Sequence, residues 1–365
     1  MARILNIGYR HFRENVKDKK IVLWGAGRLA SYYIRTFCEG LDILFIVDKD
    51  ERLWGKEFEV EGVRYLVTRE DALLDRLAEN ANLGENISIF ITPTAYAGEI
   101  IKHINMIRAL DDIDCYAGVL MRDYYEASPF SFTEGEEKIP RKIHYCWFGG
   151  KEIPDHLKRY MESWYKYCPD YEIIRWDESN YDISKNRYMR EAYECKKWGF
   201  VPDYARLDII YNEGGIYLDT DVELLAPLDK LLKDEMFCGF SCNFQIAMGL
   251  GFGAIKGHSC IRELRDYYDD QSFYQPNGEM NLKMCNEYQN PVFEKLGFDL
   301  RNHYQKRDGI IVYPSEVLSP DSGLVFKNYS DHTVAVHHFE SSWASEKEKK
   351  AFELFKKEIS NCTLI

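Results

Sequence analysis

Short apolar runs alternate with amphipathic stretches along the first third of the chain. The runs lie at 20–24, 43–47 and 87–91, and the stretches with apolar residues at helical spacing lie at about 28–38, 69–80 and 98–109. Strands that alternate with helices pair in parallel within one sheet. The pattern therefore predicts an α/β domain of the Rossmann-like, doubly wound type over residues 1–126.

A second α/β domain is predicted over residues 139–365. The segment 127–138 contains Pro, Gly, Ser and acidic residues without any periodicity, which is typical of a linker. Strand and helix patterns resume at Ile139, and the predicted elements include helices at 155–167, 187–197 and 203–213 and a last strand at 333–339. An apolar stripe then predicts a C-terminal amphipathic helix, with Ala351, Phe352, Phe355 and Ile359 on one side.

Composition narrows the class of protein. The chain has 365 residues, enough for two domains, and a formal net charge of −13, which argues against a nucleic-acid partner. Ten scattered cysteines without a C-x-x-C pair fit neither a zinc site nor a disulfide framework. No run approaches 18 apolar residues, so we expect a cytoplasmic protein without a membrane span, and attachment to the inner face of the membrane stays open.

The densest group of chemically useful residues lies within residues 201–229. Asp203 and Arg206 share one helical face, Gly214-Gly215 ends that helix, and the next strand ends in Asp219-Thr220-Asp221. In open α/β sheets, ligands bind beyond the carboxyl ends of strands. Paired carboxylates there suit a divalent cation that also holds phosphates.

The acidic pair has two other interpretations. A solvated acidic turn needs no ligand at all. A calcium loop would use Asp219, Asp221 and Glu223, but Leu224 stands where such a loop needs glycine and Lys230 where it needs an acid.

Three blocks of sequence stand out: IPRKIHYCWFGGKEIP from Ile139, D-x-x-R…G-G-x-Y-x-D-x-D over 203–221, and HHFESSW over 337–343. In this order they resemble glycosyltransferase family 32, which carries a DxD sugar-binding motif. Ile210 and Tyr211 stand in place of the family's usual leucine region. The resemblance covers about residues 138–345 and implies a GT-A-type nucleotide-sugar-binding domain.

The resemblance also implies roles for single residues. Asp219, Asp221 and Arg206 would be catalytic: Asp221 would bind Mn²⁺ or Mg²⁺, Asp219 would contact the sugar nucleotide directly or through the metal, and Arg206 would reach the diphosphate or the transferred sugar. Asp203 would accept hydrogen bonds from hydroxyls of the donor, and Trp147 would stack on its base.

The closing block supplies the remaining implied roles. His337 would complete the metal shell, and Ser342 and Trp343 would cap the diphosphate. His338 competes with His337 for the metal, but alternation along a strand places the two on opposite faces, which favours His337.

The activity implied by the resemblance is metal-dependent sugar transfer with retention of configuration. The donor would be a nucleoside-diphosphate sugar, and the acceptor a saccharide of a bacterial capsule or other surface polysaccharide, free or lipid-linked. The donor base (UDP or GDP), the sugar, the linkage and the oligomeric state stay open. An NAD(P)-dependent sugar-nucleotide oxidoreductase and a non-catalytic carbohydrate-binding scaffold are the alternatives.

The N-terminal domain carries a separate candidate site. W-G-A-G-R-L-A, starting at Trp24, fits G-x-G-x-x-A, and Asp48 follows Gly27 by 21 residues. The domain resembles Rossmann-like modules found beside sugar-modifying enzymes. Gly25, Gly27 and Asp48 are thus candidates for binding a nucleotide, and the alternative is a vestigial fold used for assembly or for positioning an acceptor.

Overall fold

The structure is a computed structural model, and the chain divides into two compact units. One unit comprises Met1–Glu126 with Ala344–Ile365, and the other Ala127–Trp343. The structure describes residues 3–79, 86–94, 96–123, 125–241, 245–323, 326–340, 350, 353 and 355–357. The last segment thus groups with the first unit, whereas the sequence pattern predicted it in the second domain. Of the stripe predicted there, Ala351, Phe352 and Ile359 lie outside the described residues.

The first unit contains a seven-stranded sheet with the order β1-β7-β6-β2-β3-β5-β4. The strands are β1 (Arg3–Ile4), β2 (Lys20–Trp24), β3 (Asp42–Val47), β4 (Glu57–Val60), β5 (Val63–Thr68), β6 (Ile87–Ile91) and β7 (Asp114–Ala117). Every neighbouring pair is parallel except β4 with β5. The chain therefore winds outward from β2 in both directions, and the predicted doubly wound α/β fold is confirmed.

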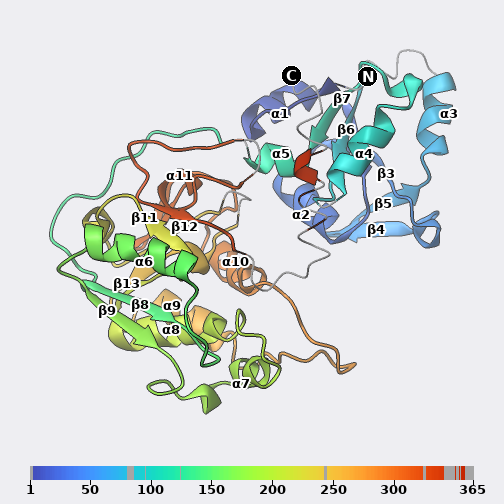
Figure 1. The fold of residues 1–365 in the computed structure, drawn as a ribbon. Helices are drawn as coiled ribbons and strands as arrows, with labels where there is room; N and C mark the ends of the chain where they lie inside the picture. The colour runs from blue at the N-terminus through green and yellow to red at the C-terminus, as the bar shows by residue number, and fades with distance from the viewer. Residues whose placement is uncertain are drawn as a thin grey trace. The chain divides into compact units, whose positions relative to one another are not determined.

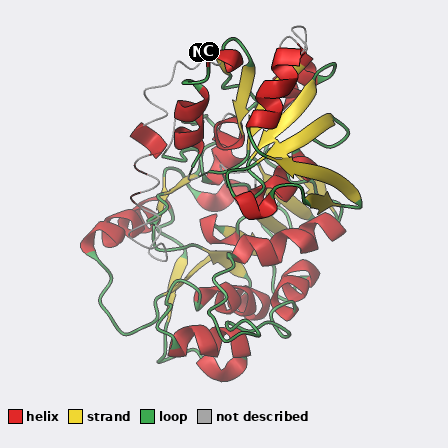
Figure 2. Cartoon of the chain, turned by 90° about the vertical axis from the view of Figure 1, so that its right-hand side faces the viewer, coloured by secondary structure: helices red, strands yellow, loops and turns green. Residues whose placement is uncertain are grey.

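Helices flank the strands of this sheet (Figure 2). They are α1 (Tyr9–Val16), α2 (Arg28–Thr36), α3 (Asp71–Glu79), α4 (Ala97–Ile104) and α5 (Gly118–Asp123). All five residues of β6 and the last four of β2 are buried. Parallel strands covered on both faces consist of continuous apolar residues, which explains the runs seen in the sequence.

The second unit is built on a mixed sheet with the order β14-β15-β12-β13-β10-β8-β9 (Figure 1). Its strands are β8 (Lys142–Cys146), β9 (Glu172–Trp176), β10 (Gly215–Tyr217), β12 (Met236–Gly239), β13 (Phe252–Ala254), β14 (Gln305–Arg307) and β15 (Ile310–Tyr313). Strands β9, β8 and β10 are parallel, and β13 runs antiparallel to both of its neighbours. A separate antiparallel pair joins β11 (Val222–Leu224) to β16 (Ala335–His337).

The helices of the second unit are α6 (Asp155–Tyr167), α7 (Arg187–Glu194), α8 (Pro202–Glu213), α9 (Ser259–Asp266), α10 (Cys285–Lys295) and α11 (Ser315–Leu318). Helix α8 is buried from Asp203 to Ile210. A helix enclosed on all sides must pair the charges it carries, because an isolated buried charge is very costly. This requirement shapes the site described below.

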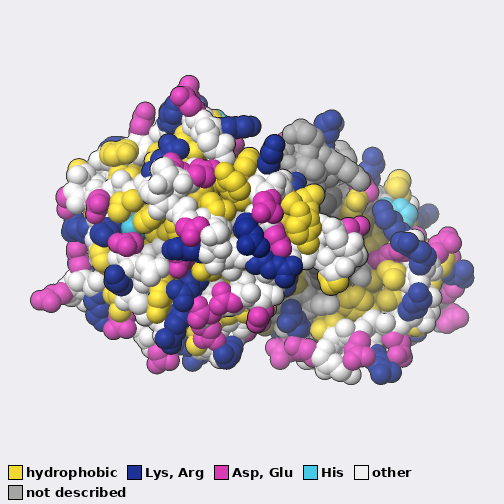
Figure 3. All heavy atoms as spheres, turned by 90° about the horizontal axis from the view of Figure 1, so that it is seen from below, with side chains coloured by type: hydrophobic (Ala, Val, Ile, Leu, Met, Phe, Trp, Pro, Cys, Tyr) yellow, Lys and Arg dark blue, Asp and Glu magenta, His cyan; other side chains and the backbone are white. Residues whose placement is uncertain are grey.

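No helix among the described residues combines the length and the apolar character needed to cross a bilayer. On the face drawn in Figure 3, Lys and Arg side chains are interspersed with Asp and Glu.

His144 on β8 joins three elements of the second unit. It is fully buried, and the Trp176 indole N–H donates to its Nδ1 at 3.0 Å. Its Nε2 lies 2.9 Å from the Gly214 carbonyl oxygen, so Nε2 carries the proton of a neutral ring. Gly214 and Gly215 both have positive φ, and a Cβ on Gly215 would lie 3.0 Å from His144 Nε2. Glycine at this corner lets the end of α8 approach β8.

We expect His144 to make stability fall with acidification. Burial lowers its pKa from 6.5 to about 4. Between these pH values His144 is protonated in the unfolded chain but neutral in the folded chain. The free energy of unfolding therefore falls as the pH falls through this window, by about 3 kcal/mol in total. In His144→Gln, which retains a donor and an acceptor without titrating, the loss between pH 7 and pH 4 measured by urea unfolding should be smaller by that amount. Equal losses in both proteins would show that His144 is not held neutral.

Candidate active site

The Asp219–Asp221 segment lies where the main sheet meets the two-stranded pair. It follows β10, an inner strand, and the Leu218 N–H still donates to the His144 carbonyl at 3.0 Å. One residue after Asp221, β11 begins and pairs with β16. Both flanks of the acidic segment are thus held by strand pairing.

The register of β16 brings His337 to these acids. His337 lies opposite Val222, and its Nε2 is 3.3 Å from Asp221 Oδ1. The backbone N–H of His338 donates to the Asp221 carbonyl at 3.0 Å, but its imidazole points elsewhere: Nε2 is 2.9 Å from Glu223 Oε2, and the ring stacks on Tyr160 with centroids 3.9 Å apart. Of the two competing imidazoles, the structure therefore brings only that of His337 to the acidic side chains.

Asp219, Asp221 and His337 each offer one ligand atom, and these atoms lie within 4.8 Å of one another. Carboxylate oxygens with one imidazole suit Mn²⁺, and carboxylates suit Mg²⁺. Two carboxylates this close repel each other, and a cation between them removes that cost. The residues present therefore fit a divalent cation.

Arg206 on α8 is the buried counter-charge of this site. Its Nη2 bonds Asp203 Oδ1, its Nη1 lies 3.6 Å from Asp219 Oδ2, and its Nε donates to the Pro202 carbonyl at 3.1 Å. All three guanidinium nitrogens thus face protein acceptors. The Tyr217 hydroxyl donates to the other oxygen of Asp219, Oδ1, at 2.9 Å.

Burial and charge act against each other in this network. Burial raises the pKa of Asp203 to about 6 although Arg206 opposes the shift. Burial and the charge of Asp221 raise the pKa of Asp219, again against Arg206. Burial would lower the pKa of Arg206, but the two carboxylates outweigh it and hold that pKa well above its usual value. Arg206 is therefore permanently charged, as the acids require.

Gly249 closes one side of the network. It lies in the 3₁₀ turn η6 (Met248–Leu250), and a Cβ at this position would stand 2.6 Å from Asp219 Oδ2 and 3.0 Å from Arg206 Nη1. Only glycine allows this turn to approach the ion pair without displacing it.

Buried tyrosines surround Asp203 on its other side. The Tyr188 hydroxyl donates to Asp203 Oδ2 at 3.4 Å, and the Tyr188 ring packs against Tyr268 and Tyr288 with centroids 5.2 and 5.9 Å away. Asn281 Nδ2 donates to the Tyr288 hydroxyl at 2.8 Å, which links the rings to the segment that precedes α10.

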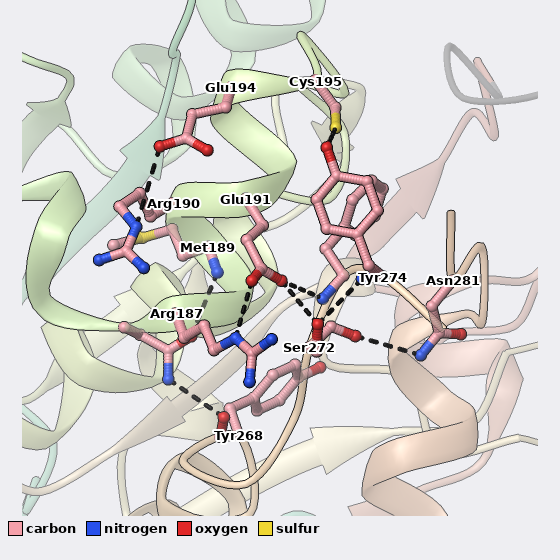
Figure 4. Close-up of polar contacts among 12 residues, drawn as sticks. Arg187, Met189, Arg190, Glu191, Glu194, Cys195, Tyr268, Ser272, Tyr274 and Asn281 are labelled. Atoms are coloured by element: carbon pink, nitrogen blue, oxygen red, sulfur yellow. Dashed lines mark hydrogen bonds and ion pairs between the residues drawn. The ribbon is translucent and has the colours of Figure 1, made fainter. Parts of the chain in front are cut away.

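Glu191 fastens that segment to α7 (Figure 4). Its carboxylate accepts the Ser272 hydroxyl and the Phe273 N–H, each at 2.8 Å, and Arg187 Nε at 2.7 Å. Asn281 Nδ2 lies 3.4 Å from the Ser272 carbonyl. Both ends of the chain between Ser272 and Asn281 are thereby tied to the shell around Asp203.

The remaining predicted site residues make no described contact with this group, lie outside the described residues, or belong to the first unit. Trp147 directly follows β8 and is half-buried, and its indole N–H donates to the Lys151 carbonyl at 2.6 Å. Ser342 and Trp343 lie outside the described residues. Gly25, Gly27 and Asp48 belong to the first unit, where they follow β2 and β3.

Sequence reasoning assigned neither Tyr217 nor Gly249 a contact with Asp219. A signal existed for Tyr217, because it precedes Asp219 by two residues in an extended segment and so faces the same side. Gly249 lies 30 residues further along the chain, and no pattern in the neighbouring sequence predicts its contact with Asp219.

Comparison with known proteins gives a family match for the segment that contains Asp219 and Asp221. Residues 154–238 match the family described as "Glycosyltransferase sugar-binding region containing DXD motif". The segment from 154 to 238, which holds both acids, is thus similar to the DXD glycosyltransferases, the family indicated by the sequence blocks.

Sequence and structure comparisons also find individual proteins that are similar to parts of the chain. The chain is 35% identical over 141 residues to inositol phosphoceramide mannosyltransferase 3 of Schizosaccharomyces pombe, covering 36% of this chain and 38% of the relative. It is 28% identical over 132 residues to Subversion of eukaryotic traffic protein A of Legionella pneumophila, covering 29% and 20%. The chain thus spans between a fifth and two fifths of the length of these relatives. Among solved structures, the PaToxG glycosyltransferase aligns with a TM-score of 0.36 at 18% identity, covering 44% of this chain and 71% of that one.

We expect Gly249→Ala to weaken Mn²⁺ binding at least about tenfold, because the added methyl group must push Asp219 or Arg206 aside. Calorimetric titration with Mn²⁺ measures the change. Gly257→Ala is the matched control: its methyl meets no atom within 4 Å, but its φ of +76° makes alanine cost about 1 kcal/mol of stability. Unchanged Mn²⁺ affinity in Gly249→Ala would mean that Asp219 plays no part in holding the cation.

Proposed function

We propose that the second unit is a divalent-cation-dependent glycosyltransferase that moves a sugar from a nucleoside-diphosphate sugar to a saccharide hydroxyl with retention of configuration. The observation that carries the proposal is the convergence of Asp219, Asp221 and His337 at the end of an inner strand. The family assignment of the segment that holds both acids supports it.

Asp221 and His337, with Asp219, would hold the cation. When bound, the cation supplies positive charge to the diphosphate that leaves with the nucleoside. Hydrogen bonds and an ion pair already orient the two acids. Asp221 Oδ2 accepts the Glu340 N–H at 3.1 Å. Asp219 accepts a hydrogen bond from the Tyr217 hydroxyl and forms an ion pair with Arg206.

Arg206 acts in this proposal as a positioning residue. Because its nitrogens already face Asp203, Asp219 and the Pro202 carbonyl, it orients Asp219 in place of the direct contact with the diphosphate or the transferred sugar that the family resemblance implies. Its fixed charge also adds to the positive field where the leaving group gains negative charge, without reorganisation during the reaction.

Asp203 is the acceptor for a hydroxyl of the donor. One of its oxygens is taken by Arg206, whereas the other receives, from the residues that the structure describes, only the long 3.4 Å bond from Tyr188. A sugar or ribose hydroxyl can donate to that oxygen and so fix the donor's orientation.

In the reaction, the bond between the anomeric carbon and the phosphate oxygen breaks, and the acceptor oxygen bonds to that carbon from the same face. The acceptor's proton passes to the departing phosphate, so no side chain is assigned as base. We take mannose as the first sugar to test, because the relative from S. pombe is named a mannosyltransferase, and a surface polysaccharide as the acceptor class.

Asp221→Ala is expected to reduce transfer at least about a hundredfold while the thermal midpoint changes by only a few degrees, because removing one of two repelling acids does not weaken the fold. Release of nucleoside diphosphate from GDP-mannose and UDP-hexoses is measured with saccharide acceptors, with Mn²⁺ and with EDTA. Wild-type turnover should require the cation.

Asp155→Asn serves as the control, since Asp155 is exposed at the start of α6 and should leave turnover unchanged. Full activity of Asp221→Ala would show that the active centre lies elsewhere in the protein. Equal turnover with Mn²⁺ and with EDTA would show that transfer does not need the cation. No turnover with any donor would contradict the proposed activity.

A further inference from the structure

A cavity of about 960 Å³ lies in the first unit and has no part in the proposed sugar transfer. It opens at the carboxyl ends of β2, β3, β5 and β6, and its lining includes Gly25, Asp48, Arg69 and Thr92. Strand β2 lies between β3 and β6, where the winding of the sheet reverses. Open α/β sheets bind ligands at this position, and the volume suits a small molecule.

Flat aromatic side chains form part of the cavity wall. Trp54 and Tyr96 line it and are 36% and 48% exposed, and apolar Val47, Pro93 and Ile100 lie between the polar groups. Large exposed rings in a concave site provide a surface on which a planar base stacks.

Lys49 is a cation of the lining that is available to a ligand. Elsewhere in the lining, Glu70 lies 2.5 Å from His103, and Asp71 pairs with Arg69 at 3.3 Å. Lys49 Nζ sits 4.9 Å from the centre of the Tyr96 ring, and no carboxylate within the described part of the chain lies within 4 Å of it. Its ammonium group can therefore meet an anion beside an aromatic ring.

The first turn of α2 faces the same cavity. Gly27 lines the cavity and begins the helix without a side-chain cap, and a Cβ on Gly27 would meet no atom within 4 Å. Packing of the protein therefore does not require glycine here, and the open space beside the turn suits a phosphate at the helix N-terminus.

Asp48 has a different role from the ribose contact predicted from its spacing. Its Oδ2 accepts the Ala26 N–H at 2.6 Å, and its Oδ1 accepts the Asp50 N–H at 2.8 Å. Both oxygens thus fasten the Gly25–Gly27 loop and the turn after β3. A dinucleotide that needs this carboxylate for its ribose diol is disfavoured.

We propose that this cavity binds a nucleoside diphosphate, with the base on the exposed rings of Trp54 and Tyr96 and the phosphates between Lys49 and the first turn of α2. Glu99, an exposed acid on the α4 wall, is placed to accept a hydroxyl or amino group of the ligand. The ligand is either a free nucleoside diphosphate or the same group within a sugar nucleotide.

The test is calorimetric titration of the full chain in EDTA with UDP, GDP, UDP-glucose, GDP-mannose and NADH. EDTA removes binding that depends on the cation of the second unit, so we expect one remaining site per chain, equally present in Asp221→Ala. Trp54→Ala and Lys49→Ala should each weaken it at least about tenfold, because they remove a stacking surface and an available cation. Lys56→Ala, an exposed neighbour outside the lining, should not.

Preference for a free diphosphate over its sugar conjugate, or the reverse, distinguishes the two sources. The inference is overturned if no nucleotide binds in EDTA, if NADH binds more tightly than every nucleoside diphosphate, or if binding disappears in Asp221→Ala but persists in Lys49→Ala. Nucleotide binding that persists in EDTA and requires Trp54 would support this inference even if no sugar transfer is found. Failure of the proposed activity therefore leaves the inference unaffected.

Discussion

Repulsion between Asp219 and Asp221 is the physical constraint that determines which charged residues surround the site of the second unit. Two carboxylates at the end of a buried strand need positive charge nearby, and Arg206 is supplied from α8, which is itself buried. A guanidinium buried there must in turn be paired on its other side, which Asp203 does. The ion pairs are therefore a condition for placing these acids in the fold.

The same logic extends along α8. Asp208, also buried, accepts the Tyr181 hydroxyl at 2.8 Å and the Lys185 ammonium at 2.9 Å, and Arg265 lies 3.6 Å away. Each acid on the enclosed part of the helix thus meets a partner from another element or from the next turn. Charged residues on α8 consequently determine which neighbours can pack against it, as well as what the site can bind.

Much of this architecture was accessible from the sequence, and the reasons are specific. Strands covered on both faces leave apolar runs, which is why β2, β3 and β6 were recognised. Alternation along β16 separated His337 from His338, because residues one apart on a strand face opposite ways. Between 230 and 308 the strands have only three or four residues, too few to show a period, so β12, β13 and β14 were not predicted. The partners of Arg206 and the approach of Gly249 depend on contacts between distant segments, which spacing does not encode.

The pairing of β11 with β16 has a consequence for biosynthesis. Three residue pairs join a strand at 222–224 to one at 335–337, more than a hundred positions later. While the polypeptide is being made, the acids emerge from the ribosome long before the imidazole that meets them. A nascent chain therefore carries two mutually repelling carboxylates without His337 until translation has passed that residue, and the three-residue group is among the last features of this unit to assemble.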